Sequence, residues 1–271
     1  MYYSNKLVLI TGGASGIGKI MGRRIIEQGG KLIIWDINTA GIESTIKEFS
    51  SIGNSIGYTI DLNDFDAIQK VAAKTKLEHG IPDLIINNAG IIVGKHFEDH
   101  TENEITATMN INATAPMLVS LAFLPEMIKR RSGHICNIAS SAGLVSNPKM
   151  SVYAASKWAL IGWSDSLRLE MERSDSNIYV TTVNPYYINT GMFSGVRSII
   201  PILNPEKTAD KILKAVEKKK VFLTLPLSMH LIRFLQGILP ISAFDFIADK
   251  VLGIYSSMDD FKGRNNHKAT N

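Results

Sequence analysis

The sequence predicts an α/β protein in which a parallel sheet of about seven strands has helices on both faces, a doubly wound sandwich. Seven short runs rich in β-branched residues alternate with about six longer segments of helical pattern. Most runs are apolar throughout, as expected of strands that β-α-β crossovers bury on both faces. No low-complexity linker or internal repeat divides the chain, so a single domain is predicted. The expected strands are residues 6–11, 31–36, 55–62, 83–90, 133–140, 178–185 and 221–226.

The composition fits a soluble globular protein of ordinary size. The 271 residues are 45% apolar and carry a net charge of +4 without a basic stripe, so no nucleic-acid partner is expected. The single cysteine, Cys136, excludes an intramolecular disulfide and a cysteine-based zinc site and fits a reducing compartment. The N-terminal apolar run is short and soon broken by glycine, which disfavours a signal peptide. We therefore expect a cytoplasmic protein.

The first expected strand leads into TGGASGIGK, residues 11–19, which holds four glycines. Gly12, Gly16 and Gly18 lie where the strand hands over to a helix expected to begin near Ile17. Backbone N–H groups and the positive end of that helix can face a pyrophosphate there. A tight turn without a ligand would use the same residues, so the motif needs support from the next strand.

The second expected strand supplies that support because it ends at Asp36, about twenty residues further on. A carboxylate at this position can accept hydrogen bonds from a ribose 2′-hydroxyl, whereas it would repel a 2′-phosphate. No basic residue follows at Ile37 or Asn38. The pair of strands therefore predicts a dinucleotide site that prefers NAD to NADP, the alternative being that Asp36 only ends a strand.

A possible site of chemistry lies in YAASK, at the start of a helical segment that runs to about Arg173. Tyr153 and Lys157 are four residues apart and so share one helix face. A cation near the phenol is expected to lower its pKa from about 10, which would let the tyrosine exchange protons with an alcohol or carbonyl. Without further context, such a pair is more often a solvated helix face.

Taken in order, these motifs resemble the short-chain dehydrogenase/reductase family over nearly the whole chain to about Leu225. The glycine motif corresponds to residues 11–18, the adenine-side acid to Asp61 with Leu62, and the NNAG motif to residues 87–90. The resemblance implies a single-domain Rossmann-type fold for residues 1–226. It also implies a set of cofactor-binding residues: Gly12, Ser15, Gly16, Ile17, Gly18, Asp36, Asp61, Leu62, Asn88, Ala89, Gly90, Tyr153, Lys157, Pro185 and Thr190.

The resemblance also implies a catalytic tetrad. Asn112 in NINATAP is the best match for the asparagine because LPEM follows at the expected distance, with Asn110 as the competing choice. Ser140 stands thirteen residues before Tyr153, as the family's serine does. Ser140 would hydrogen-bond the substrate oxygen, Tyr153 would transfer the proton, Lys157 would lower the tyrosine pKa and hold the ribose, and Asn112 would keep a relay water. The cofactor supplies the hydride, and no metal is needed.

One position departs from the family pattern. Pro185 and Thr190 are in place after the sixth strand, but Tyr186 stands where the family usually has glycine. The ring either enters the reaction centre or turns outward, and either orientation leaves hydride transfer possible.

The family resemblance implies that substrate choice depends on the segment between the sixth and seventh strands, residues 187–211 with a lid at about 190–205, and on the C-terminal extension, residues 227–271. The lid segment is largely apolar, which indicates either a lid over an apolar substrate or ordinary packing. Together with the serine of the tetrad and Tyr186, this segment supplies the expected substrate contacts, which are Ser140, Tyr186, Met192 and Phe193.

The extension has no uninterrupted run near the ~20 apolar residues that a spanning helix needs. Three interpretations stay open for it: a membrane-surface element, a subunit contact, or a cap that lengthens the substrate pocket. Its residues 257–264, SMDDFKGR, resemble family members that act on retinoid-like or long-chain alcohols.

The sequence therefore predicts an NAD-linked oxidoreductase that interconverts a primary or secondary alcohol and its carbonyl. Because family members are commonly dimers or tetramers, a homo-oligomer is expected. The alternative is a non-catalytic dinucleotide-binding module, which would need only the glycines and Asp36.

Overall fold

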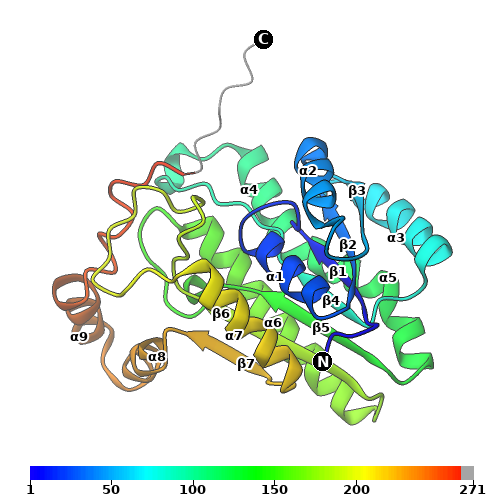
Figure 1. Ribbon diagram of the computed structural model, residues 1–271. Helices are drawn as coiled ribbons and strands as arrows, with labels where there is room; N and C mark the ends of the chain where they lie inside the picture. Colours follow the sequence, from blue (N-terminus) through cyan, green and yellow to red (C-terminus); the bar gives the residue numbers. More distant parts are fainter. Residues whose placement is uncertain (264–271) are drawn as a thin grey trace.

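A computed structural model describes residues 1–263 (Figure 1). Its sheet has seven parallel strands in the order β3-β2-β1-β4-β5-β6-β7, which confirms the doubly wound fold. The order reverses between β1 and β4, and ligands of such folds bind at this switch point. The strands are β1 (Leu7–Thr11), β2 (Lys31–Asp36), β3 (Ser55–Thr59), β4 (Leu84–Asn87), β5 (Gly133–Ile138), β6 (Ile178–Pro185) and β7 (Phe222–Leu225).

All seven expected strands are present, and several end earlier than expected because their last residues turn into the cleft. The third stops at Thr59, so Ile60, Asp61 and Leu62 lie beyond the sheet. The fourth likewise stops at Asn87.

Helices connect the strands and cover both faces of the sheet (Figure 1). They are α1 (Gly16–Glu27), α2 (Thr39–Phe49), α3 (Phe65–His79), α4 (Glu102–Met109), α5 (Ala115–Lys129), α6 (Ser151–Arg173) and α7 (Pro205–Glu217). Short 3₁₀ turns are η1 (Phe97–Asp99) and η3 (Ser141–Gly143), and a π turn, η2 (Asn110–Thr114), joins α4 to α5. The extension forms α8 (Ser228–Ile238), α9 (Ile241–Phe246) and a second π turn, η4 (Ile247–Val251).

Two apolar cores lie on opposite faces of the sheet and explain why the strands are apolar throughout. In β1, Ile10 packs with the core beneath α1, α2 and α7, while its neighbour Leu9 packs with the core beneath α3, α5 and α6. Successive strand residues point to opposite faces, so both faces need apolar side chains. Cys136 is buried in the first of these cores as a free thiol.

Within residues 1–263, one helical segment, Glu102–Lys129, is long and apolar enough to cross a membrane by length and composition alone. It consists of α4, η2 and α5. Val119, Phe123 and Met127 on this segment are fully buried against the sheet. The segment is therefore part of the protein core in this structure.

A third core joins the extension to the segment after β6. Tyr186, Tyr187 and Ile200 pack in one cluster with Met229 and Met258 of the extension. In Figure 1 the red end of the chain runs beside the yellow segment that follows β6. Residues 264–271, which include Arg264 of the SMDDFKGR segment, lie outside the described residues.

Candidate active site

The glycine turn after β1 needs glycine for two different reasons. Gly12 and Gly16 have φ angles of 65° and 52°, in the left-handed region that favours glycine. Gly18 needs space instead, because a Cβ there would overlap the carbonyl oxygen of Gly12 and lie 2.6 Å from Nδ2 of Asn88. Gly18 therefore lets α1 pack closely against the turn, while Gly12, Ser15, Gly16 and Ile17 line the cleft itself.

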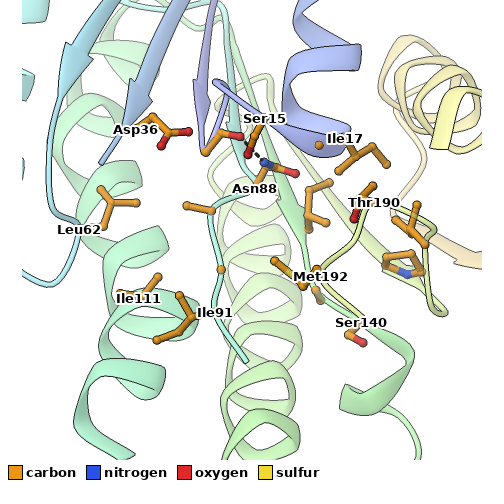
Figure 2. Close-up of a pocket in the computed structure, with 18 of the residues that line it drawn as sticks. Ser15, Ile17, Asp36, Leu62, Asn88, Ile91, Ile111, Ser140, Thr190 and Met192 are labelled. Carbon is orange, nitrogen blue, oxygen red and sulfur yellow. Dashed lines mark hydrogen bonds between the residues drawn. The ribbon is translucent and has the colours of Figure 1, made fainter. Parts of the chain in front are cut away.

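The end of β4 holds this turn in place (Figure 2). Asn88 Nδ2 donates to the carbonyl oxygens of Thr11 and Gly12, each at 3.0 Å. The Thr11 hydroxyl accepts from the backbone N–H groups of Asn88 and Ala89 at 3.0 and 3.1 Å. Asn88, Ala89 and Gly90 line the cleft, so the NNAG motif both fixes the phosphate turn and forms one wall.

Asp36 lines the cleft at the end away from Ser140 (Figure 2). Its two carboxylate oxygens accept hydrogen bonds from the N–H groups of Ala14 and Asn38, each at 3.0 Å. These bonds fix the direction of the carboxylate and leave it facing the cleft, which Asp61 and Leu62 line at the same end (Figure 2).

One continuous cleft runs from Asp36 to Ser140, and its residues fit a dinucleotide. Gly12 and Gly16 line it without side chains, and the N-terminus of α1, which begins at Gly16, faces it. Figure 2 shows Asp36 and Leu62 on one side of the cleft and Ser140 and Thr190 on the other.

At the other end of the cleft, β5 and α6 bring three of the expected catalytic side chains together. Ser140 follows β5, and Tyr153 and Lys157 lie one turn apart on α6. All three are buried and line the cleft. Lys157 Nζ donates to the Ile138 carbonyl at 3.0 Å and lies 5.7 Å from the centre of the Tyr153 ring.

The expected lowering of the tyrosine pKa is wrong for this geometry. Burial raises the pKa of Tyr153 to about 12, although the hydrogen bond with Ser140 acts in the lowering direction. Burial also lowers the pKa of Lys157 to about 8. Desolvation is the largest cause of both shifts, because Tyr153 packs in the third core and Lys157 is 3% exposed.

Asn112 is fully buried in the π turn η2 and does not line the cleft. Its Oδ1 accepts from the N–H of Ile91 at 2.8 Å, and its Nδ2 donates to the Ile91 carbonyl at 2.9 Å and to Ser156 Oγ at 3.0 Å. Ser156 Oγ in turn donates to the Tyr153 carbonyl at 2.7 Å. The competing Asn110 points elsewhere and donates to Asn63 at 2.9 Å. Of the two, Asn112 is therefore the one connected to Tyr153.

The remaining predicted residues, Pro185, Tyr186, Thr190, Met192 and Phe193, line the same end of the cleft. The ring of Phe193 meets the Tyr153 ring edge-on, with centroids 6.2 Å apart. Tyr186 is 7% exposed, so its ring is not turned outward.

Sequence reasoning missed several apolar residues of the cleft, each adjacent to or near a motif residue. Ile91 follows Gly90, and Ile111 precedes Asn112, for example. Position beside a motif is the signal that marks them. The missed lining residues are Trp35, Ile37, Ile60, Ile91, Ile111, Ile138, Ala139 and Ile188.

The extension is tied to the segment that carries Phe193. Backbone hydrogen bonds run from Lys262 N to the Ser194 carbonyl at 2.9 Å and from Arg197 N to the Ser257 carbonyl at 3.2 Å. The hydroxyls of Tyr187 and Ser257 are 2.9 Å apart. The tail thus forms an outer layer over residues 187–197.

Comparison with known proteins decides the family. The family model for short chain dehydrogenase matches residues 6–199. The chain belongs to the short-chain dehydrogenase family. The human protein epidermal retinol dehydrogenase 2 is 36% identical over 265 residues, which cover 95% of this chain and 85% of that protein.

Solved structures agree on the fold. A short chain dehydrogenase/reductase from Burkholderia phymatum in complex with NAD has a TM-score of 0.81 at 20% identity, covering 88% of this chain and 94% of that one. A metagenomic short-chain oxidoreductase in complex with NADP has a TM-score of 0.71 at 27% identity, covering 83% and 97%. The family member described here is an NAD(P)-dependent oxidoreductase acting on CH–OH groups of a small-molecule alcohol or on the corresponding carbonyl.

Proposed function

We propose that this enzyme interconverts an apolar primary or secondary alcohol and its aldehyde or ketone, with NAD preferred to NADP. The observation that carries the proposal is one cleft with a dinucleotide-type turn at one end and Ser140, Tyr153 and Lys157 at the other. Met192 and Phe193 add an apolar wall beside them. The relative named epidermal retinol dehydrogenase 2 supports a long apolar alcohol of the retinoid kind as the substrate class.

In the reducing direction, Ser140 donates a hydrogen bond to the carbonyl oxygen and Tyr153 gives that oxygen its proton. A phenol with a raised pKa is fully protonated at neutral pH and therefore ready to donate. The carbonyl carbon would receive a hydride from reduced nicotinamide bound in the cleft, which becomes oxidised. Lys157, held by the Ile138 carbonyl, would stabilise the tyrosinate that remains and would hold the nicotinamide ribose.

Asn112 acts as a positioning residue in this proposal. Its bonds to Ile91 and Ser156 hold the wall of the cleft to the first turn of α6. We also propose that Asn112 keeps a relay water in place, as the family resemblance implies.

The preference for NAD rests on Asp36. Its carboxylate is fixed at the ribose end, and Ile37 and Asn38 provide no cation to neutralise a 2′-phosphate. The cofactor contacts are those predicted from the sequence, with Gly18 contributing through packing.

For the rest of the molecule, we propose a dehydrogenase domain of residues 1–226, a substrate lid at about 190–205, and residues 227–271 as an extension of the same domain. The enzyme is cytoplasmic and forms a homodimer or homotetramer. The outer face of the extension consists of Leu231, Phe234, Ile238, Ile241 and Phe246, each at least 59% exposed. We name it the outer apolar face and propose that it rests on a membrane surface.

A substrate screen tests the proposal. Alcohols and carbonyls graded by chain length, with a retinoid included, are incubated with NAD or NADP while the absorbance of reduced nicotinamide is followed. We expect turnover that increases with chain length and is lost in Tyr153→Phe. Tyr179→Phe is the matched control, because that hydroxyl donates to Asn177 at the surface, away from the cleft. No turnover of any alcohol or carbonyl with either cofactor would overturn the proposal.

A further inference from the structure

A second, smaller cavity lies directly behind the catalytic end of the cleft. Two residues, Ser140 and Tyr186, line both spaces. The cavity has a volume of about 20 Å³, enough for one water-sized group. Its other walls are Ser141, Ala142, Val145, Asn147, Met150, Tyr187, Met229 and Ile254.

Tyr186 contributes to the walls of both spaces, and its side chain and backbone are held from several sides. Its hydroxyl lies 2.8 Å from Ser198 Oγ, and its backbone N–H donates to the Leu225 carbonyl at 2.8 Å. Its ring packs on Tyr187, with centroids 4.5 Å apart. A glycine here, as in the family pattern, would leave this partition open.

The two substituents of a substrate carbonyl meet different surroundings. With the oxygen between Ser140 and Tyr153, one substituent faces the side of the cleft lined by Met192 and Phe193. The other faces Tyr186 and the small cavity behind it.

We propose that Tyr186 is a specificity-determining residue that closes the substrate site behind Ser140, so that one carbonyl substituent must be no larger than hydrogen or methyl. This inference rests on the proposed function and narrows its substrate class. The long apolar group of the substrate lies on the side of Met192 and Phe193. Primary alcohols, aldehydes and methyl carbinols or ketones are accepted, whereas compounds with two large substituents are rejected.

Removing the ring would join the two spaces. Most of the walls exposed in this way are apolar, among them Val145, Met150, Met229 and Ile254. Two of its polar groups are already paired, since Asn147 Nδ2 donates to Ser257 Oγ at 3.1 Å and to the Tyr187 hydroxyl at 3.3 Å. The enlarged space would therefore accept an alkyl group.

A purely structural role for Tyr186 predicts something different. The Tyr186–Ser198 hydrogen bond also anchors the segment that carries Phe193, so losing it would weaken catalysis on all substrates alike. If the Tyr186 ring instead limits the size of the second substituent, its removal changes the ratio of kcat/KM between substrates with small and large substituents.

The experiment compares two ketones with the same long alkyl chain, one carrying methyl and the other propyl on the second side. For the parent enzyme we expect kcat/KM to favour the methyl ketone by at least tenfold. Tyr186→Ala should move this ratio by tenfold or more toward the propyl ketone, while Tyr186→Phe should keep the parent ratio because the ring remains. Val145→Ala, which enlarges only the cavity behind the wall, should change the ratio only together with Tyr186→Ala.

Thermal unfolding of each variant separates folding from specificity. If Tyr186→Ala does not fold, Tyr186→Leu retains apolar volume, lacks the ring, and should move the ratio in the same direction. An unchanged ratio in a folded variant, or equal use of both ketones by the parent, overturns the inference. Absence of turnover of every alcohol and carbonyl by the parent would instead count against the proposed function.

Discussion

Lys157 and Tyr153 face the same cleft from successive turns of α6, with the ammonium nitrogen 5.7 Å from the centre of the phenol ring. Both groups are buried, and burial shifts their pKa values toward the neutral forms. The lysine is therefore a charge that the fold retains at the expense of stability.

Lys157→Met is expected to stabilise the protein near neutral pH and to abolish activity. In the folded protein the lysine pKa is about 8, below its unfolded value of about 10.4, so the folded state binds this proton less tightly. Stability of the parent should rise with pH between these two values. The gain in the variant at pH 7 should be on the order of 2–3 kcal/mol. Urea unfolding at pH 7 and pH 10 checks this, with a smaller difference between the proteins expected at pH 10.

The same variant should also bind NAD more weakly, because the ammonium is expected to contact the ribose. A Lys157→Met protein that is less stable than the parent at neutral pH, or whose advantage grows with pH, would contradict the burial argument.

Tyr153→Phe is expected to reduce turnover by about 10²–10⁴-fold while leaving NAD affinity nearly unchanged. The phenylalanine ring keeps the contact with Phe193, and only the transferable proton is lost. Single-turnover kinetics and titration calorimetry measure the two quantities. Retention of most activity would show that the proton comes from another group.

Much of the fold followed from the sequence because its strands are local apolar runs. The glycine turn, Asp36 and the Tyr153–Lys157 pair are also local patterns, so they were found from residue spacing. Ser140 and Asn112 were found only through the family resemblance, since neither has a local signature of its own.

Long-range packing was not predictable in the same way. The bond between Tyr187 and Ser257 joins residues 70 positions apart, and nothing local marks it. The direction of the Tyr153 pKa was missed for a similar reason. It depends on how much of the chain closes over the phenol, which a spacing of four residues does not reveal.

NAD is expected to bind at least tenfold more tightly than NADP, which corresponds to about 1.4 kcal/mol. Asp36→Asn should reduce this ratio, because it removes the charge while an amide oxygen still accepts one of the backbone hydrogen bonds. Calorimetry with both cofactors provides the measurement. Asp175→Asn, at an exposed site where the carboxylate pairs with Arg131, is the matched control. Equal affinities in the parent would remove the argument for NAD.

The last prediction concerns the outer apolar face of the extension. Met229 and Ile232 of α8 are buried in the third core, whereas Leu231 and Phe234 on the same helix are 60% and 62% exposed. The solvent side of the helix thus carries large apolar side chains beside the exposed His230, Arg233 and Gln236, which a helix serving only the core does not need.

Leu231→Glu combined with Phe234→Glu is expected to abolish co-sedimentation with liposomes and to leave kcat/KM for a short, water-soluble alcohol within about twofold. Burying each of these side chains in a lipid interface contributes about 1.5–3 kcal/mol, so losing both should weaken binding by at least tenfold. Leu77→Glu is the matched control, because this leucine is 87% exposed on α3, away from the extension. The membrane proposal is wrong if the parent stays in the supernatant with liposomes. If light scattering then shows the double variant to be smaller in mass than the parent, the face is a contact between subunits.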